Sequence, residues 1–461
     1  MAHPRSRTLP DLLDEITAPD PAHELIVGGG ERISYVETRA RARRLAKGLL
    51  RLGVGRGDKV ALLMGNRPEW LVIDFAVTML GATLVPVSTW SRARELGYVL
   101  DHCDATTLIT IARFAGQDYL GMLAELGGPG SPRLPKLARV VVVDAERHGP
   151  LTAFDSLWDL GAAVGDAELD AAQRAVKADD VAYILYTSGT TSTPKGVQLA
   201  HGGLIENMWN IGERQHLTPA DRMWMGISLF WSFGCANALL TVMTHGGTIV
   251  LQEALEPGAA LALIERERCS VYYGTPNIAL ALTEHPDRAR RDLSSLRTGA
   301  AIGPPPAMQM VMDLGVREIC NVYGLTETYG NCSVTDAHDS PDVRRSTVGF
   351  PLPGMEIRIV DRQTRRPLPT GEVGEILVRG YLTPGYYKDP DKNAAAFDAE
   401  GFLVTGDLGA IGDDGRLRFR GRIKEMVKTG DRIPDIAGVT AACRPAHRAI
   451  LAGSVTPSSR M

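Results

Sequence analysis

Short apolar, β-branched runs alternate with longer amphipathic stretches through roughly the first 330 residues of the chain. This alternation predicts mainly parallel sheets covered by helices, because each helix returns the chain to the start of the next strand. In the first block the expected strands are Lys59–Met64, Thr83–Val87, Thr106–Ile111 and Arg139–Val143, and the expected helices are Glu69–Leu80 and Glu95–His102. The stretch Ala162–Asp180 is typical of a polar connection.

A second block begins with the expected strand Val181–Tyr186. Further strands are predicted at Thr248–Leu251, Ser270–Tyr273 and Ile319–Val322, with helical patterns between them. From Ser346 to Arg420 the pattern changes to short alternating strands interrupted by glycine and proline, such as Glu356–Val360 and Glu375–Val378. This texture predicts a small, mostly antiparallel β unit.

Composition restricts the class of protein and of partner. A chain of 461 residues is long enough for roughly two to four domain-sized units. Its 44% hydrophobic and 23% charged residues are typical of a globular protein. The formal net charge of −4 provides no basic field for nucleic acid or anionic lipid, so we expect a small-molecule partner.

Cysteine usage and hydropathy indicate the compartment. The six cysteines lie far apart, without a CxxC pair or a neighbouring histidine cluster, so they predict reduced, mostly buried thiols and no zinc site. Met1–Leu12 lacks the apolar run of a signal peptide, and no stretch reaches the ~20 apolar residues of a membrane span. We therefore expect a cytoplasmic protein without a transmembrane segment.

The most informative string is YTSGTTSTPKG, residues Tyr186–Gly196, which directly follows an expected buried strand. Its hydroxyl side chains, two glycines and Lys195 suit an anionic polyphosphate. The interval from Gly189 to Lys195 fits a Walker A loop, but Pro194 replaces the second glycine and Gly196 replaces the final Ser or Thr. The alternative interpretation is a flexible Ser/Thr/Gly connector.

Four more strings follow in order: NVYGLTET at Asn321–Thr328, GEVGEILVRG at Gly371–Gly380 with Gly385–Tyr387, TGDL at Thr405–Leu408, and GRIKEMVK at Gly421–Lys428. Together with the phosphate loop they resemble the signature segments of the adenylate-forming enzyme superfamily. That superfamily includes acyl-CoA synthetases, peptide-synthetase adenylation domains and firefly luciferase. The resemblance covers about residues 10 to 430.

The resemblance implies an α/β fold with two stacked αβα subdomains at residues 10–180 and 181–345, each with a mainly parallel sheet. A small β-barrel-like subdomain with the ribose-binding motif is expected at 346–423. Relatives continue past a hinge, here Lys424, with an α+β lobe of about 100 residues. Only residues 425–461 follow Lys424, without the expected glycine-rich turn or terminal Pro...Gly-Lys motif. The segment 424–461 is therefore expected to be a truncated, non-native remnant.

The activity implied by the resemblance is that of an AMP-forming acid-thiol ligase. It would use ATP and Mg²⁺ to convert a carboxylic acid to an acyl-adenylate and transfer the acyl group to coenzyme A. Two alternatives stay open: a catalytically impaired nucleotide- or acyl-binding remnant, and a ligase that serves a carrier-protein thiol. The sequence does not specify an oligomeric state.

The resemblance also assigns the nucleotide site, residue by residue. Glu327 would hold Mg²⁺, since Mg²⁺ prefers hard oxygen ligands. Tyr323 would stack on adenine, Gly324 would contact the nucleotide, and Asp407 and Arg422 would contact the ribose. The residues assigned to phosphates are Thr187, Ser188, Gly189, Thr190, Thr191, Lys195 and Thr326. Those assigned a catalytic role are Thr187, Lys195, Thr326 and Glu327. Gly299, Ala300 and Ala301 would pass between adenine and the acyl group.

The expected acyl site is largely apolar and predicts a fatty or aryl acid. Trp231 stands where many relatives have a histidine, and an indole carries no titrating charge. Amino-acid substrates are disfavoured because Cys235 follows Gly234, where relatives that use them have an aspartate. The residues assigned to this site are Phe230, Trp231, Phe233, Gly299, Tyr329 and Gly330.

Each of these residues also has a purely structural interpretation. Tyr323 is equally compatible with a core tyrosine, and Trp231 and Phe233 with packing between two sheets. Asp407 and Arg422, taken singly, fit solvated surface charges. The small residues Gly299–Ala301 fit close packing of strands and helices.

Overall fold

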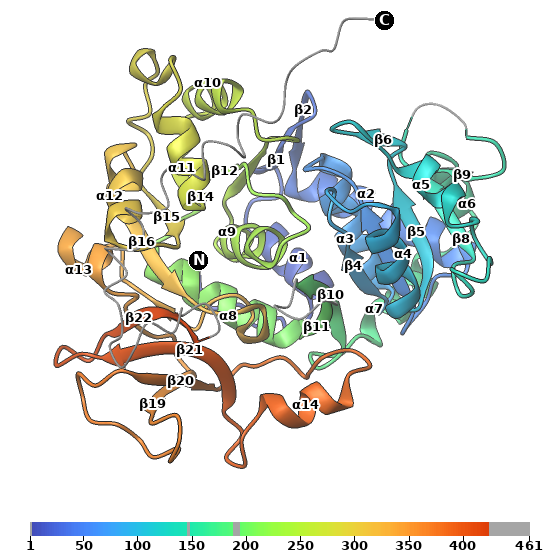
Figure 1. The fold of residues 1–461 in the computed structure, drawn as a ribbon. Helices are drawn as coiled ribbons and strands as arrows, with labels where there is room; N and C mark the ends of the chain where they lie inside the picture. Colours follow the sequence, from blue (N-terminus) through green and yellow to red (C-terminus); the bar gives the residue numbers. More distant parts are fainter. Residues whose placement is uncertain (1, 145–147, 188–193, 424–461) are drawn as a thin grey trace, which may run out of the picture.

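The computed structural model describes residues 2–144, 148–187 and 194–423 (Figure 1). Two large sheets and one small antiparallel sheet form the framework. The nine-stranded sheet has the order β18 (Phe350–Pro351), β17 (Ser333–Val334), β16 (Glu318–Tyr323), β15 (Thr298–Ala301), β14 (Val271–Gly274), β12 (Arg222–Met225), β13 (Thr248–Leu251), β1 (Glu24–Gly28) and β2 (Glu31–Ser34).

The seven-stranded sheet has the order β11 (Lys195–Ala200), β10 (Val181–Thr187), β4 (Thr83–Pro86), β3 (Lys59–Leu63), β5 (Ala105–Thr110), β8 (Arg139–Val142) and β9 (Thr152–Ala153). Both large sheets are parallel inside, and antiparallel partners stand only at edges: β2, β17 and β18 in the larger sheet, β11 in the smaller. The expected α/β fold with mainly parallel sheets is confirmed.

The small sheet contains β19 (Glu356–Val360), β20 (Gly374–Arg379), β21 (Leu403–Ile411) and β22 (Leu417–Arg422), all antiparallel. It lies at the bottom of the view in Figure 1. Among the described residues this sheet is open, with β19 and β22 as its edges, so the expected barrel-like closure is wrong. A separate hairpin pairs β6 (Arg113–Phe114) with β7 (Gln117–Asp118).

The two large sheets exchange strands across the expected division between residues 180 and 181. The strands β1 and β2, from the first block, lie in the nine-stranded sheet, whereas β10 and β11, from the second block, lie in the seven-stranded sheet. The pairing of β10 with β4 is parallel, with Tyr183 opposite Leu84. The chain therefore crosses between the sheets, and a division by sequence at residue 180 does not separate them.

Helices cover these sheets and fill the layer between them. The helix α1 (Leu9–Thr17) contacts α2 (Tyr35–Leu52), α3 (Pro68–Met79), α8 (His201–Arg214) and α9 (Leu240–Thr244), and Figure 1 shows α1 and α9 between the two sheets. The α-helices are α1 (Leu9–Thr17), α2 (Tyr35–Leu52), α3 (Pro68–Met79), α4 (Ala93–His102), α5 (Tyr119–Glu125), α6 (Ser156–Gly161), α7 (Asp166–Arg174), α8 (His201–Arg214), α9 (Leu240–Thr244), α10 (Pro257–Glu267), α11 (Pro276–Thr283), α12 (Pro305–Asp313), α13 (Pro341–Ser346) and α14 (Pro390–Ala396). A π-helical segment, η1 (Phe233–Leu239), and two 3₁₀ turns, η2 (Arg288–Arg290) and η3 (Thr326–Thr328), complete the set.

Local sequence explains where α2 begins and ends and why α7 forms. The Ser34 side chain accepts from the backbone N–H of Glu37 at the start of α2, and Gly53 ends the helix at φ +91°. The segment expected as a polar connection contains α7, so that prediction is wrong. Its alanine-rich sequence favours a helix, and Leu169 is buried on its inner side.

The helix α3 is buried on almost every side, and Glu69 is its one residue that is not buried. A helix that is apolar all round packs between layers and not on a surface. Its Asp74 is fully buried, and the hydroxyl of Tyr183 on β10 donates to Asp74 Oδ2 over 2.7 Å. Burial raises the pKa of Asp74 to about 7, against which the Tyr183 hydrogen bond acts weakly.

Two further expectations concern thiols and membranes. The five described cysteines are free and buried, as expected, and Cys443 lies outside the described residues. Within the described ranges, none of the helices is both long and apolar enough to cross a membrane.

The raised pKa of Asp74 predicts a pH dependence of stability. Between about pH 4 and pH 7 the folded chain holds a proton on Asp74 that the unfolded chain has lost, so this contribution to stability falls as pH rises. The Asp74→Asn variant lacks this titrating group. We therefore expect its free energy of unfolding, relative to that of the unmodified chain, to be higher at pH 8 than at pH 5 by on the order of a few kcal/mol. Thermal unfolding midpoints of both proteins from pH 5 to pH 8 measure the effect.

The comparison removes the opposing contribution of His201, whose pKa burial lowers to about 4 in both proteins. Midpoints that change in parallel with pH in the two proteins would contradict a proton held on Asp74.

Candidate active site

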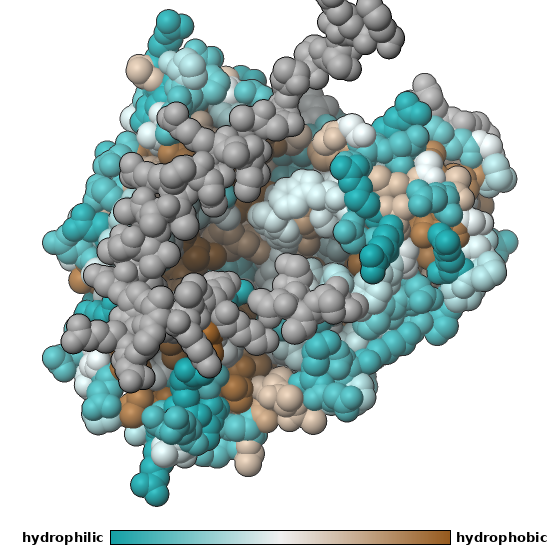
Figure 2. Space-filling model, viewed as in Figure 1, coloured by the Kyte–Doolittle hydropathy of each residue, from teal (hydrophilic) through white to brown (hydrophobic). Residues whose placement is uncertain are grey.

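A cavity of about 1270 Å³ opens at the carboxyl ends of the central parallel strands. The strand β10 ends there at Thr187, β12 leads to Phe230, β15 to Ile302, and β16 to Gly324. The strands β21 and β22 of the small sheet border its other side. Carboxyl ends of parallel strands are where open α/β folds place ligands. Figure 2 shows hydrophobic residues gathered in a hollow on this face of the molecule.

Most of the described residues predicted for the site meet at this cavity. The predicted residues that line it are Thr187, Lys195, Phe230, Trp231, Phe233, Gly324, Thr326, Glu327, Gly330, Asp407 and Arg422. The predicted residues Ser188, Gly189, Thr190, Thr191 and Lys424 lie outside the described residues.

The centre of the cavity wall is an ion pair between Lys195 and Glu327. Lys195 Nζ lies 2.5 Å from Glu327 Oε1, and the Glu327 side chain is only 5% exposed. The hydroxyl of Tyr386 donates to the same Oε1 over 2.7 Å and accepts from Lys195 Nζ over 3.1 Å. Burial, followed by the charge of Glu327, raises the pKa of Tyr386 and keeps it a donor.

The backbone around Glu327 fixes this arrangement. Glu327 lies in the 3₁₀ turn η3, where Thr328 Oγ1 accepts from the backbone N–H of Leu325 over 3.0 Å. The carbonyl of Glu327 accepts from the backbone N–H of Thr383, which leads to the segment carrying Tyr386. A turn held from both sides presents one carboxylate to one lysine with little conformational freedom.

Thr187 stands opposite Lys195 at the open end of the β10–β11 pair. Its Oγ1 is buried and has no hydrogen-bond partner among the described residues. A buried hydroxyl without a partner is costly, so a ligand oxygen here would satisfy it. This atom fits the predicted contact with a phosphate.

On the side of the small sheet, Asp407 is 3% exposed and lies 3.7 Å from the guanidinium of Arg422. The hydroxyl of Tyr323 donates to Asp407 Oδ2 over 2.9 Å, and burial, then the charge of Asp407, raises the pKa of Tyr323. The Tyr323 ring stacks on Phe419 at 5.5 Å between centroids and does not line the cavity. Tyr323 therefore contacts Asp407, one of the two residues expected at the ribose, from beneath the cavity wall, and its ring is not part of the lining.

Gly299, Ala300 and Ala301 also lie behind the wall, buried in β15. A Cβ on Gly299 would stand 1.8 Å from the Tyr272 carbonyl oxygen, so close strand packing requires glycine there. The next residue, Ile302, lines the cavity instead. The sequence did not point to Ile302, because Ile302 is large and apolar whereas the assigned segment Gly299–Ala301 consists of small residues.

Tyr329, predicted for the acyl site, packs away from the cavity against α8. A Cβ on Gly203 would lie 2.2 Å from the Tyr329 ring, and the Tyr329 hydroxyl accepts from the backbone N–H of Ala200. Gly330 does reach the cavity.

The apolar part of the cavity includes a cluster of aromatic rings. Trp231 is 37% exposed and meets Trp90 edge to face at 4.9 Å, and Phe230 meets Trp90 at 5.3 Å. Sequence analysis missed Trp90, which lies far from Trp231 along the chain. It also missed Tyr386, although Tyr386 stands in the Gly385–Tyr387 string that carried the resemblance.

Comparisons with known proteins agree with this architecture. The model of the AMP-binding enzyme family matches residues 13–387. YngI of Bacillus subtilis, an acyl-CoA synthetase by name, is 36% identical over 439 residues, which cover 92% of this chain and 80% of YngI. Acyl-CoA ligase sidI of Aspergillus fumigatus is 31% identical over 412 residues, covering 87% and 70% of the two chains.

Among solved structures, ATP-bound MatB from Rhodopseudomonas palustris matches with a TM-score of 0.79 at 26% identity, covering 92% of this chain and 80% of MatB. The chain belongs to the AMP-binding enzyme family. The resemblance seen in the sequence motifs is thereby confirmed.

The shared hydroxyl of Tyr386 predicts a measurable stability contribution. Tyr386→Phe leaves the buried Glu327 carboxylate with one donor fewer, so we expect a loss of about 1–3 kcal/mol in the free energy of unfolding. Urea denaturation followed by fluorescence measures it. Tyr381→Phe is the matched control, because the Tyr381 hydroxyl has no hydrogen bond within the described ranges, and an equal loss in both variants contradicts the assignment.

Proposed function

We propose that this chain activates a carboxylic acid with ATP, forming an acyl-adenylate and pyrophosphate, and then transfers the acyl group to coenzyme A. The observation that carries the proposal is the buried ion pair of Lys195 and Glu327 at the cavity wall. The acyl-CoA synthetase and ligase names of the relatives support the same chemistry.

The reaction brings two anions together. A carboxylate oxygen forms a bond to the α-phosphorus of ATP, while the bond from that phosphorus to the bridging oxygen breaks and pyrophosphate leaves with the electron pair. A lysine placed at the departing phosphates stabilises this charge. Lys195 stands beside the hydroxyl of Thr187, which has no hydrogen-bond partner in the described part of the chain, and both groups suit phosphate oxygens.

Glu327 fits the magnesium role. Its carboxylate is a hard oxygen donor at the same wall, and Mg²⁺ binds to few protein groups alongside phosphate oxygens. Bound Mg²⁺ would neutralise charge on the phosphates. Without nucleotide, Lys195 and Glu327 neutralise each other; with it, each exchanges its partner for an opposite charge on the ligand.

The remaining assignments divide the cavity between nucleotide and acid. Asp407 on β21 and Arg422 on β22 line the cavity from the small sheet, where a carboxylate and a guanidinium suit ribose hydroxyls. Phe230, Trp231 and Ile302 form an apolar wall without a titrating group, which suits a fatty or aryl acid.

The first prediction from this function concerns nucleotide binding. Lys195→Ala and Glu327→Gln should each lower acid-dependent ATP–pyrophosphate exchange by at least about 100-fold, because each removes charge from the phosphate region. Calorimetry should show weaker binding of MgATP to both variants. Lys136→Ala, which removes a 61%-exposed lysine that does not line the cavity, should change neither.

Unchanged affinity for MgATP in Lys195→Ala and Glu327→Gln would contradict the site. MgATP binding with no exchange over a broad panel of acids would support the alternative of a binding protein without catalysis. Acyl transfer to a carrier-protein thiol but not to coenzyme A would support the other acceptor.

The second prediction concerns the acid. Trp231→Ala should raise KM for apolar acids by about tenfold, since it removes most of one aromatic wall, and should leave the affinity for MgATP unchanged. Trp158→Ala, at a tryptophan on α6, is the matched control. Equal KM values in Trp231→Ala and the unmodified chain would place the acid elsewhere.

A further inference from the structure

A second cluster of side chains that could bind a metal ion lies at the other end of the strands of the nine-stranded sheet. The cavity is at the carboxyl ends of β15 and β16, whereas this cluster lies near their amino ends. Arg297 directly precedes β15 and donates to the carbonyl of His216 over 3.1 Å. The cluster is therefore separate from the candidate active site.

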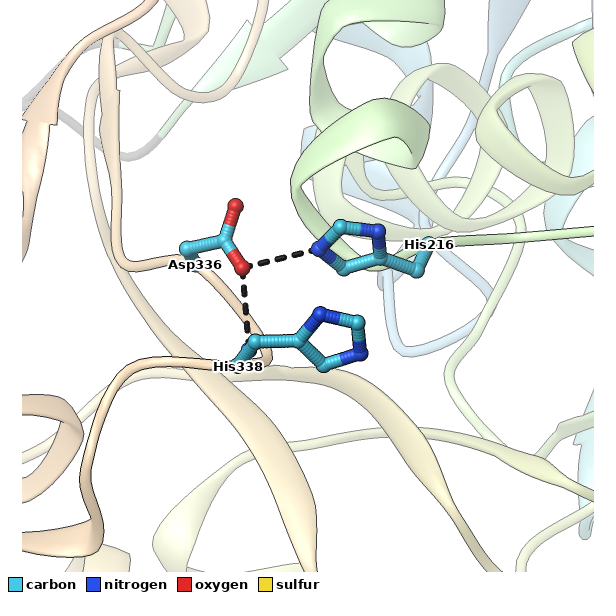
Figure 3. Close-up of side chains that lie close together, drawn as sticks. All are labelled: His216, Asp336 and His338. Carbon is cyan, nitrogen blue, oxygen red and sulfur yellow. Dashed lines mark hydrogen bonds and ion pairs between the residues drawn. The ribbon is translucent and has the colours of Figure 1, made fainter.

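The cluster consists of His216, Asp336 and His338, whose possible ligand atoms all lie within 4.8 Å of one another. His216 Nε2 lies 2.8 Å from Asp336 Oδ1, and the same oxygen accepts from the backbone N–H of His338 over 2.9 Å. The two imidazole rings stack with centroids 3.8 Å apart (Figure 3).

Two segments far apart in sequence are held together here. His216 follows α8, and its backbone adopts φ +51°, a costly conformation for a residue with a side chain. The backbone N–H of Ala337 donates to the carbonyl of Arg214 at the end of α8 over 2.8 Å. This link fixes the loop that carries Asp336 and His338 against the segment that carries His216.

Asp339 secures the same loop. Its carboxylate accepts from the backbone N–H of Asp336 over 3.0 Å and from Arg416, before β22, over 2.7 Å. These contacts hold the backbone of Asp336 and pair Arg416 with Asp339. The Asp336 carboxylate itself contacts His216 and the backbone N–H of His338. Side chains positioned in this way by the backbone and by neighbouring residues are a requirement for a metal site.

We propose that His216, Asp336 and His338 bind one divalent cation of the zinc type. Imidazole nitrogen together with a carboxylate oxygen suits Zn²⁺, Co²⁺, Ni²⁺ or Cu²⁺, whereas Mg²⁺ prefers oxygen ligands alone. The ion replaces the hydrogen bond between His216 and Asp336. Because the lone pair of an imidazole nitrogen lies in the ring plane, the exposed His338 ring turns out of its stack with His216 to bind the same ion, and water completes the coordination. Bound there, it joins the end of α8 to the loop after β17.

The test is a Co²⁺ titration of the full chain, without an affinity tag and after removal of metals by a chelator. We expect a visible d–d absorption that saturates at one Co²⁺ per chain, disappears on addition of Zn²⁺ and persists in millimolar Mg²⁺. A wild-type chain without a saturable spectrum would overturn the proposal. A thiolate charge-transfer band would also overturn it, because the ion would then be on a cysteine.

Variants locate the ion. His338→Ala, at an exposed residue, and Asp336→Asn, which keeps an oxygen to accept from the His338 N–H, should each weaken Co²⁺ binding at least about tenfold. His285→Ala removes a histidine that also lies beside a carboxylate, Asp287 at 4.0 Å, and should leave binding unchanged. Equal affinities in His338→Ala, Asp336→Asn and the unmodified chain would refute the assignment.

Discussion

The contact on which the site depends is the ion pair between Lys195 and Glu327, with the hydroxyl of Tyr386 shared between them. Each residue comes from a different unit: Lys195 from the seven-stranded sheet, Glu327 from the turn after β16, and Tyr386 from the segment after β20. Backbone hydrogen bonds hold β11 against the segment that carries Tyr386. The N–H of Gln198 donates to the carbonyl of Gly385, and the N–H of Tyr387 donates to the carbonyl of Gly196. The same contacts that join the units thus assemble the charged centre of the cavity.

The exchange of strands between the large sheets explains why the cavity forms where it does. The carboxyl end of β10, in the seven-stranded sheet, and those of β12, β15 and β16, in the nine-stranded sheet, open toward one space. The small open sheet covers that space from a third side. A boundary drawn by sequence at residue 180 cannot show this, because strand order depends on pairing between distant segments.

Much of the local structure could be predicted. The strands Thr248–Leu251 and Glu356–Val360 have the expected bounds, and the other expected strands differ by one residue at one or both ends. The polar wall could also be predicted, because Lys195 and Glu327 belong to contiguous strings with chemical meaning. The apolar wall could be predicted only in part. Ile302, which lines it, and Trp90, which packs on Phe230 and Trp231, belong to no such string, and Tyr329 points toward α8 because Gly203 leaves room for its ring.

By itself, the sequence determined many of the strands, the family and the chemical character of the phosphate loop, because periodicity and short motifs are local properties. Only the tertiary structure decided which side chains meet. Lys195 reaches Glu327 across 132 residues, Tyr183 reaches Asp74 across 109, and His216 reaches Asp336 across 120. Such meetings follow from strand order and from the direction of each side chain in the packed protein, and neither is encoded in any short window of residues.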